Sequence, residues 1–286
     1  MNHREMQWKA NDGTSLFAQA WEPKANVKGI ICLVHGLGEH SGRYHHWANK
    51  LTSAGFALLT FDLRGHGRSG GKRGDTPSFN HFADDIDILL DQAAKEYPDT
   101  PTFLYGHSLG GMLTLYYLIN NKPVIDGAMV TSPGLRTMLD QQKVKVTALR
   151  ILEPILPKLT IPNGLELEGL SRDESVVKNY IDDPLVHDRV TLRMGKDMID
   201  TIDFIFANAS KVDLPLLLMH GSGDRITYHH GTEEFAGKVN SRCTLKIWDG
   251  FYHELHNEPE KDRVFNYLLD WLHRHQQTQQ SSAELN

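Results

Sequence analysis

The chain has 286 residues, of which 40% are hydrophobic and 23% are charged, and its formal net charge is −6 at pH 7. This composition is typical of a globular protein with a full hydrophobic core and excludes a disordered chain. The acidic balance argues against non-specific binding of nucleic acid, and two cysteines are too few for a disulfide framework.

Apolar runs and amphipathic helical patterns alternate along the first half of the chain. Residues 6–21, with Asp12-Gly13 in the middle, are typical of an antiparallel hairpin. Short apolar runs that predict buried strands follow at 29–35, 56–62, 101–105 and 127–132. Apolar residues at helical spacing predict helices at 44–54, 79–97 and 112–119. This alternation predicts an α/β fold with a doubly wound, mostly parallel sheet.

The alternation stops after residue 133 and resumes near residue 213. Residues 134–212 show helical periodicity, several prolines and no clear strand, and they are too many for an ordinary connection. We expect them to form a helical cap insertion between two parts of one core, residues 1–133 and 213–275. The second part contains predicted strands at 214–220 and 244–248 and an amphipathic helix at 259–275. The polar residues 276–286 predict a disordered tail.

The strand at 101–105 leads into Gly106-His107-Ser108-Leu109-Gly110, which matches the pattern Gly-x-Ser-x-Gly. A strand, a sharp turn with serine at its apex and a helix together make up a nucleophile elbow. A side chain at Gly106 or Gly110 would collide with neighbouring backbone, so the glycines permit the tight turn. We therefore expect Ser108 to be a nucleophile presented above the sheet.

A nucleophilic serine needs a base, and the base needs an acid that orients it. In a fold of this kind the acid and the histidine follow late strands, in the chain order Ser, Asp, His. Asp224 comes just after the strand at 214–220, and His253 comes just after the strand at 244–248. We predict that Ser108, Asp224 and His253 form a catalytic triad.

His256 is an alternative base, because it lies one helical turn beyond His253 in His253-Glu254-Leu255-His256. We favour His253, which is nearer to the end of the strand. The same four residues resemble a zinc-binding pattern, but the two histidines are three apart, whereas that pattern requires four. We therefore expect neither a metal nor a cofactor.

The negative oxygen of a tetrahedral intermediate needs hydrogen-bond donors. One predicted donor is the backbone N–H of Leu109, the residue after the nucleophile. The other is the N–H of Leu37, which lies between Gly36 and Gly38 in the loop after the strand at 29–35. The flanking glycines allow this backbone to approach a substrate closely.

Six motifs together resemble the monoacylglycerol lipases of the α/β-hydrolase superfamily: HGLGEHSGRYHHWANKL, DLRGHGRSGG, YGHSLGG, TSPGL, LLLMHGSGDR and WDGFYHELHNE. The resemblance covers residues 29–272 and is weakest in the cap. It implies an α/β-hydrolase fold, the same triad and the same oxyanion donors. It also implies a polar pocket for glycerol, and the matching positions here are Glu39, Arg43, His107 and Tyr180.

We predict a serine hydrolase that cleaves the ester bond of monoacylglycerol to release fatty acid and glycerol. A lysophospholipase or a broad-specificity carboxylesterase is an alternative, and a non-catalytic α/β-hydrolase that serves as a binding protein is another.

Apolar residues of the cap could line an acyl channel, touch a membrane surface or pack the cap onto the core: Leu149, Ile151, Leu152, Ile155 and Leu156. No stretch approaches the roughly 20 apolar residues of a membrane-spanning helix, and residues 1–25 contain no run that suits a signal peptide. We therefore expect a soluble, cytoplasmic protein, peripheral to a membrane if its cap touches one.

Overall fold

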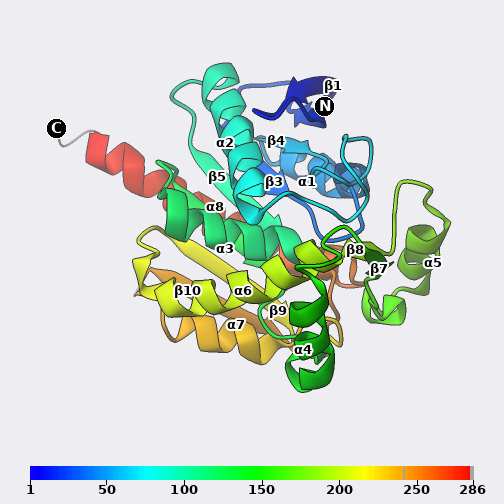
Figure 1. Ribbon diagram of the computed structural model, residues 1–286. Helices are drawn as coiled ribbons and strands as arrows, with labels where there is room; N and C mark the ends of the chain where they lie inside the picture. The colour runs from blue at the N-terminus through cyan, green and yellow to red at the C-terminus, as the bar shows by residue number, and fades with distance from the viewer. Residues whose placement is uncertain (241, 284–286) are drawn as a thin grey trace.

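An eight-stranded sheet forms the centre of the computed structural model, which describes residues 1–240 and 242–283 (Figure 1). Its strands are β1 (Asn2–Lys9), β2 (Ser15–Glu22), β3 (Gly29–Val34), β4 (Phe56–Phe61), β5 (Thr102–His107), β6 (Gly127–Thr131), β9 (Leu216–Gly221) and β10 (Cys243–Trp248). Their order across the sheet is β1-β2-β4-β3-β5-β6-β9-β10. The strand β2 pairs antiparallel with β1 and β4, and the other neighbours pair in parallel.

The inner strands are buried along their whole length because helices cover both faces of the sheet. Every residue of β3, β4, β6 and β9 is buried, as the continuous apolar runs predicted. The edge strand β10 is mostly half-buried. Because β3, β5, β6, β9 and β10 are parallel neighbours, their carboxyl ends lie along one edge of the sheet, where open α/β folds place their sites.

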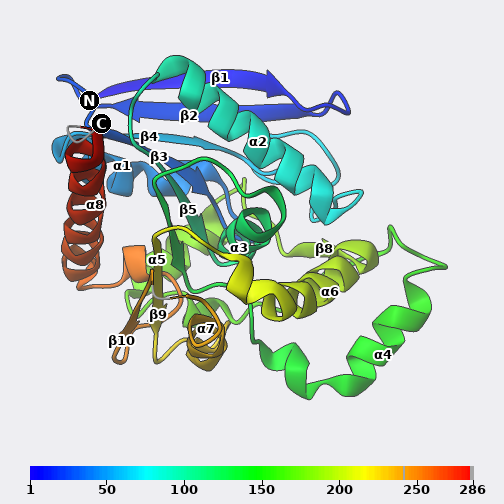
Figure 2. The same ribbon diagram turned by 90° about the vertical axis from the view of Figure 1, so that its left-hand side faces the viewer.

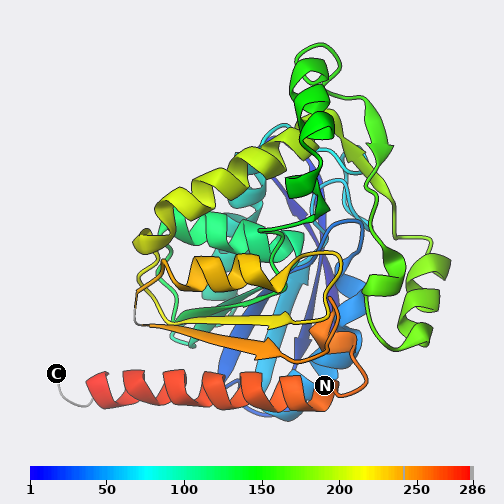
Figure 3. The same cartoon turned by 90° about the horizontal axis from the view of Figure 1, so that it is seen from below.

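Two layers of helices enclose the sheet (Figure 3). One face is covered by α1 (His45–Ser53) and α8 (Lys261–Ala283), and the other by α2 (Phe79–Glu96), α3 (Leu109–Asn121), α6 (Leu192–Asn208) and α7 (His229–Ala236). Each face has its own apolar core. Trp47 and Trp271 are fully buried in the first, and Phe82 and Phe235 are fully buried in the second.

The segment between β6 and β9 carries α4 (Lys143–Leu152), α5 (Glu174–Asp182) and α6, together with an antiparallel ladder of β7 (Thr160–Pro162) and β8 (Arg189–Thr191). The ladder corrects the expectation that this segment has no strand. Each of its strands has only three residues, too few to display an alternating pattern. The helix α4 stands away from the core, and each of its residues is exposed or only half-buried (Figure 2).

Two loops of the core form hydrogen bonds with the residues at and next to β8. The Thr191 N–H donates to the Gly74 carbonyl, and the His187 N–H donates to the Gly38 carbonyl, both at 2.9 Å. An added Cβ would lie 2.0 Å from the Arg189 carbonyl oxygen at Gly74 and 2.4 Å from the His187 carbonyl oxygen at Gly38. Glycine is therefore required at both positions by the close approach of two backbones.

Several elements differ from the sequence predictions. The helix α7 was not predicted, because only three of its eight residues are buried and one of these is a glycine. In the structure α8 continues over residues 276–283, part of the tail that the sequence predicted to be disordered. Glutamine is a good helix former, and no glycine or proline interrupts the stretch. Residues 284–286 of the predicted tail lie outside the described residues.

Among the residues that the structure describes, no helix is long and apolar enough to cross a membrane.

Candidate active site

The strand β5 passes into α3 through a tight turn with Ser108 at its apex. Ser108 has φ +55° and ψ −116°, a backbone conformation that side-chain-bearing residues rarely adopt and that costs about 1–3 kcal/mol. An added Cβ on Gly106 would lie 2.3 Å from the Gly110 carbonyl oxygen, and one on Gly110 would lie 2.0 Å from the Val34 carbonyl oxygen. Both contacts are with backbone, so the turn requires these two glycines, as the sequence predicted.

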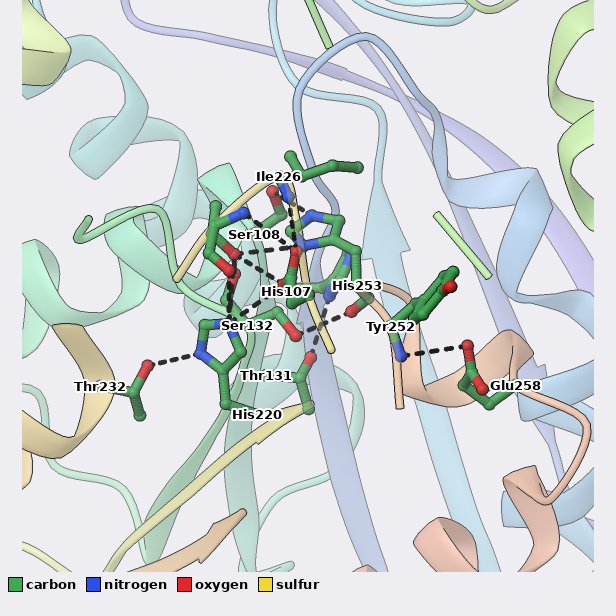
Figure 4. Close-up of polar contacts among 12 residues, drawn as sticks. His107, Ser108, Thr131, Ser132, His220, Ile226, Thr232, Tyr252, His253 and Glu258 are labelled. Carbon is green, nitrogen blue, oxygen red and sulfur yellow. Dashed lines mark hydrogen bonds and ion pairs between the residues drawn. The ribbon is translucent and has the colours of Figure 1, made fainter. Parts of the chain in front are cut away.

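Two hydrogen bonds connect Ser108, His253 and Asp224. The Ser108 hydroxyl lies 2.9 Å from His253 Nε2 (Figure 4), and His253 Nδ1 lies 2.7 Å from Asp224 Oδ2. Asp224 follows β9 and His253 follows β10, so adjacent parallel strands bring both side chains to the edge where β5 presents Ser108. The structure thus brings together the three residues that the sequence predicted as a triad.

Five hydrogen bonds converge on the carboxylate of Asp224. Its Oδ1 accepts from the backbone N–H groups of Ile226 and Thr227, at 2.8 and 3.0 Å. Its Oδ2 accepts from His253, from the Thr227 hydroxyl at 2.9 Å and from His220 Nε2 at 3.0 Å. Burial alone would raise the pKa of Asp224, but the attraction of His253 and the hydrogen bonds from His220 and His253 outweigh burial and hold the pKa well below its usual range. The carboxylate is therefore ionised at neutral pH.

The ring of His253 is buried, and yet its pKa is raised. Burial lowers the pKa, but the carboxylate of Asp224 raises it more strongly, and the charges of Glu254 and Glu39 add to this effect. The backbone of His253 is also fixed, because its N–H donates to the Gly169 carbonyl at 3.2 Å. This residue is therefore held in place to accept a proton from Ser108.

His256, the alternative base, has different surroundings. Its ring stacks on Tyr44, with centroids 4.7 Å apart, and lies edge-on to His107 at 4.8 Å. Neither of its ring nitrogens has a hydrogen-bond partner within the described part of the chain. Burial lowers the pKa of His256 to about 3. The geometry therefore favours His253 over His256 as the base.

The loop after β3 lies against Ser108. A Cβ added to Gly36 would be 3.2 Å from the Ser108 Cβ. The Gly36 N–H donates to Glu39 Oε1 at 2.6 Å, which holds the turn of this loop. Leu109 is the first residue of α3, so its N–H has no acceptor within the helix. The backbone segments that carry Leu37 and Leu109 therefore both lie beside Ser108.

A buried ion network adjoins this loop. Arg43 donates to Glu39 Oε2 at 2.7 Å and to both carboxylate oxygens of Glu254, at 2.6 and 2.8 Å. The Glu39 and Glu254 side chains are only 3% and 2% exposed. Burial raises the pKa of Glu254, but the attraction and hydrogen bonds of Arg43 outweigh it and lower the pKa to about 2. The network therefore holds two carboxylates around one guanidinium.

Tyr180 and His107, the other two residues of the predicted pocket, contact different side chains. Tyr180 belongs to α5, and the Arg43 guanidinium lies over its ring, 4.7 Å from the centroid. Tyr180 therefore joins Glu39 and Arg43. His107 instead contacts the base, because its ring lies 4.9 Å from the His253 ring. His107 Nδ1 is 3.1 Å from the Thr131 hydroxyl (Figure 4).

Sequence reasoning missed two residues of this region, His220 and Glu254. His220 lies in β9, four residues before Asp224, and its place at the end of a predicted strand was a signal that could have identified it. Glu254 is adjacent to His253 in sequence, but its partner Arg43 is 211 residues away. No local pattern reports such a contact.

The arrangement is suited to nucleophilic attack on a carbonyl carbon. A neutral His253 ring can take the Ser108 proton on Nε2 while Nδ1–H donates to the ionised Asp224. The positive charge that forms on the ring is stabilised by the carboxylate. Backbone N–H groups beside Ser108 can stabilise the negative oxygen of a tetrahedral intermediate.

The chain is similar to known hydrolases over most of its length. The family model described as serine aminopeptidase, S33, matches residues 25–260. A monoacylglycerol lipase of Mycolicibacterium smegmatis is 31% identical over 92% of this chain and 94% of its own. The crystal structure of a monoacylglycerol lipase from Paleococcus ferrophilus has a TM-score of 0.84 and 34% identity, and the match covers 91% of this chain and 99% of that one.

One relative is much longer. An uncharacterized abhydrolase domain-containing protein of Dictyostelium discoideum is 37% identical over 92% of this chain. The match spans only 28% of the length of that relative.

Proposed function

Because the chain belongs to the serine aminopeptidase S33 family of α/β-hydrolases and, within it, to the monoacylglycerol lipases, we propose that it cleaves the ester bond of monoacylglycerol to release fatty acid and glycerol. The observation that carries the proposal is the hydrogen-bonded chain from Ser108 through His253 to Asp224. The monoacylglycerol lipases of M. smegmatis and P. ferrophilus support the substrate class, because each matches nearly the whole of this chain.

In the proposed reaction the Ser108 oxygen attacks the ester carbonyl as its proton passes to His253 Nε2. Asp224 orients the ring and stabilises its positive charge, and the N–H groups of Leu37 and Leu109 donate to the oxyanion. His253 then protonates the leaving glycerol oxygen, which leaves an acyl group on Ser108. A water molecule next gives a proton to His253 and attacks the acyl carbon, and Ser108 regains its proton as the fatty acid departs.

Glu39, Arg43, His107 and Tyr180 are proposed to bind the free hydroxyls of glycerol. The Tyr180 hydroxyl lies 3.1 Å from the position of a Cβ at Gly38, in the loop that carries Leu37. Glu39 Oε2 accepts from Arg43 and has lone-pair capacity for a second donor. A site built to bond hydroxyls rejects a ligand that leaves its polar groups unpaired.

A panel of substrates tests the proposed function. The kcat/KM of the wild-type protein should be highest for monoacylglycerol and at least tenfold lower for diacylglycerol, whose second acyl chain cannot enter a hydroxyl pocket. Ser108→Ala should abolish hydrolysis and labelling by a fluorophosphonate while the melting temperature is retained.

Each alternative predicts a different result in the same panel. Equal kcat/KM for mono- and diacylglycerol would indicate a broad carboxylesterase, and preference for lysophospholipid a lysophospholipase. Preference for an aminoacyl p-nitroanilide would indicate the peptidase activity that the family description names. A wild-type protein that neither cleaves an ester nor reacts with the fluorophosphonate would be a binding protein.

Exposed apolar residues at the end of α4 and just beyond it support a second, peripheral proposal: transient contact with a lipid surface. Ile151 and Ile155 are 63% and 71% exposed, and Leu152 and Leu156 are also exposed. Leu149 is half-buried and lies 3.8 Å from the position of a Cβ at Gly195 in α6. Leu149 therefore packs α4 against α6 and is not part of the exposed apolar group. The apolar area of the four exposed residues would be removed from water at a membrane.

Co-sedimentation with phosphatidylcholine vesicles tests this contact. Ile151→Ser combined with Ile155→Ser should lower the bound fraction several-fold and leave the hydrolysis of a soluble p-nitrophenyl ester unchanged. Equal sedimentation of wild type and double variant would contradict the proposal.

A further inference from the structure

A second histidine contacts the acid of the proposed triad. His220 lies near the end of β9 and is fully buried. Its Nε2 lies 3.0 Å from Asp224 Oδ2, the same oxygen that accepts from His253. Its Nδ1 lies 2.7 Å from the hydroxyl of Thr232, which belongs to α7 (Figure 4). Both ring nitrogens are therefore engaged, one by the acid and one by a helix of the core.

The partners of His220 determine which of its nitrogens carries the hydrogen. Nε2 faces the Asp224 carboxylate and the Thr227 carbonyl oxygen at 3.0 Å, and both of these groups only accept. Nε2 is therefore the donor. A neutral ring then accepts the Thr232 hydroxyl hydrogen on Nδ1. Every polar atom of the ring is satisfied without a positive charge on His220.

We propose that His220 is a positioning residue that sets the strength of the base in the ester hydrolysis proposed above, by donating a hydrogen bond to the oxygen of Asp224 that holds His253. The inference rests on that proposed function. Asp224 Oδ2 accepts from His220, His253 and the Thr227 hydroxyl. Each donor withdraws charge from this oxygen, so His220 and His253 compete for the same lone-pair density.

Two consequences follow from this competition. The His220 donor fixes the orientation of the carboxylate, and hence the angle at which Asp224 presents itself to His253. It also limits how strongly Asp224 attracts a proton to His253. Loss of the donor should therefore raise the pKa of His253 and move the acidic limb of the kcat/KM profile to higher pH, because His253 must be neutral to act as a base.

The other groups that act on His253 remain in place when His220 is changed. His107 faces its ring at 4.9 Å, and the charges of Glu254 and Glu39 act on it from the ion network. His256 and Arg43 act on His107 in turn. Thr227 and Thr232, which complete the surroundings of His220, carry no charge. A shift of the acidic limb on substitution of His220 alone therefore reports the lost donor.

Two substitutions at one position separate the proposed role from packing. The amide nitrogen of a glutamine occupies about the place of histidine Nε2, so His220→Gln keeps a donor to Asp224 and gives up the Thr232 contact. The amide oxygen of an asparagine reaches about the place of Nδ1, so His220→Asn keeps an acceptor for Thr232 and gives up the donor to Asp224. Each variant thus retains the half of the contacts that the other one loses.

The readouts are kcat and KM for p-nitrophenyl butyrate between pH 5 and 9, the rate of fluorophosphonate labelling, and the melting temperature. A hydrogen bond to a charged group corresponds to a factor of about 10–100 in rate. We expect His220→Asn to lower kcat by about that factor with KM nearly unchanged, and to move the acidic limb upward. His220→Gln should recover kcat to within about threefold of wild type, whatever its melting temperature.

The opposite pattern, or an equal effect in both variants, would overturn the proposal. If His220 only joins β9 to α7, His220→Asn will behave as wild type and His220→Gln will be the weaker enzyme. Equal losses in the two variants would show that ring packing, and not the donated hydrogen bond, matters. The soluble ester and the label do not depend on the physiological lipid, so these results stand even if monoacylglycerol proves to be the wrong substrate.

Discussion

His253 and His256 are three residues apart in the chain but differ in every contact that matters for catalysis. His253 joins Ser108 to Asp224, whereas His256 lies in an aromatic environment with its ring nitrogens unpaired among the described residues. We expect His253→Ala to lower kcat by at least about 10³-fold, as removal of a triad base does. His256→Ala should cost less than tenfold in kcat and act mainly on stability, because it leaves a cavity beside Tyr44.

The measurement is kcat for a soluble ester, with the melting temperature recorded in parallel. A folded His256→Ala protein that loses as much activity as His253→Ala would mean that the base has been assigned to the wrong histidine.

The proposed catalytic residues could be predicted because each stands at the end of a strand that is recognisable in the sequence. Ser108, Asp224 and His253 follow β5, β9 and β10, so strand ends and chain order together identified them as candidates. The ion network could not be predicted in full, because Arg43 and Glu254 meet only after the sheet has assembled. The role of His220 likewise depends on a tautomer that its partners select, which no sequence pattern records.

The elbow between β5 and α3 leaves no space for a Cβ at Gly110. A glycine in α6 that does have such space, Gly195, provides the control. A Cβ at Gly110 would lie 2.0 Å from a backbone oxygen, whereas a Cβ at Gly195 in α6 would lie 3.8 Å from the Leu149 side chain, an ordinary contact. Gly110→Ala should abolish activity and lower the free energy of unfolding by about 1–3 kcal/mol or more. Gly195→Ala should raise that free energy by about 1 kcal/mol, because alanine is the better helix former.

Chemical denaturation of both variants and a kinetic assay provide the comparison. If Gly110→Ala retained wild-type activity, the contact between this turn and β3 would have to be looser than the structure has it. A fall in stability for Gly195→Ala would mean that α6 lacks space at this position.

The inner elements were predicted well for a physical reason: strands covered on both faces read as unbroken apolar runs. The predicted α/β-hydrolase architecture is confirmed by the similarity to the lipase of P. ferrophilus. The elements that were missed lie at the surface or in the segment between β6 and β9. Three-residue strands such as β7 and β8 have no measurable period, and α7 presents few apolar residues to the sheet. Their structure depends on tertiary contacts that the local sequence does not encode.

For the molecule as a whole, burial of neutral histidines predicts sensitivity to acid. Six histidines have lowered pKa values, with burial as the main cause: His35, His46, His66, His107, His187 and His256. The pKa is about 4 for His187 and about 3 for His256, against 6.5 for an ordinary histidine. Between pH 6.5 and the lowered pKa of each histidine, the unfolded chain binds a proton that the native protein does not. The free energy of unfolding therefore falls as the pH drops below 6.5.

Each such group contributes about 1.4 kcal/mol of lost stability per pH unit within its window. The depressed pKa values of Glu254 and Asp224 act in the same direction at lower pH. The raised pKa of His253 opposes this loss, but it is one group against six. We therefore expect the melting temperature to be highest at pH 7 or above and to fall steadily toward pH 4.

Thermal denaturation between pH 8 and pH 4 measures this decline. His256→Phe should make the decline shallower, because it keeps a ring against Tyr44 and removes one titrating group. A melting temperature that is constant or rises from pH 7 to pH 5 would contradict the expectation.

The bond between Ser108 and His253 joins residues that are 145 positions apart in the chain. Contacts of such high sequence separation form late, because a long loop must close before they contribute any stability. His253 also follows β10, which adds to the sheet at its outer edge. A nascent chain could fold its elbow and most of its sheet as it emerges and still be inert toward esters. Hydrolytic activity is therefore a reporter of completed folding. A growing chain does not hydrolyse the lipids around it until β10 has joined the sheet.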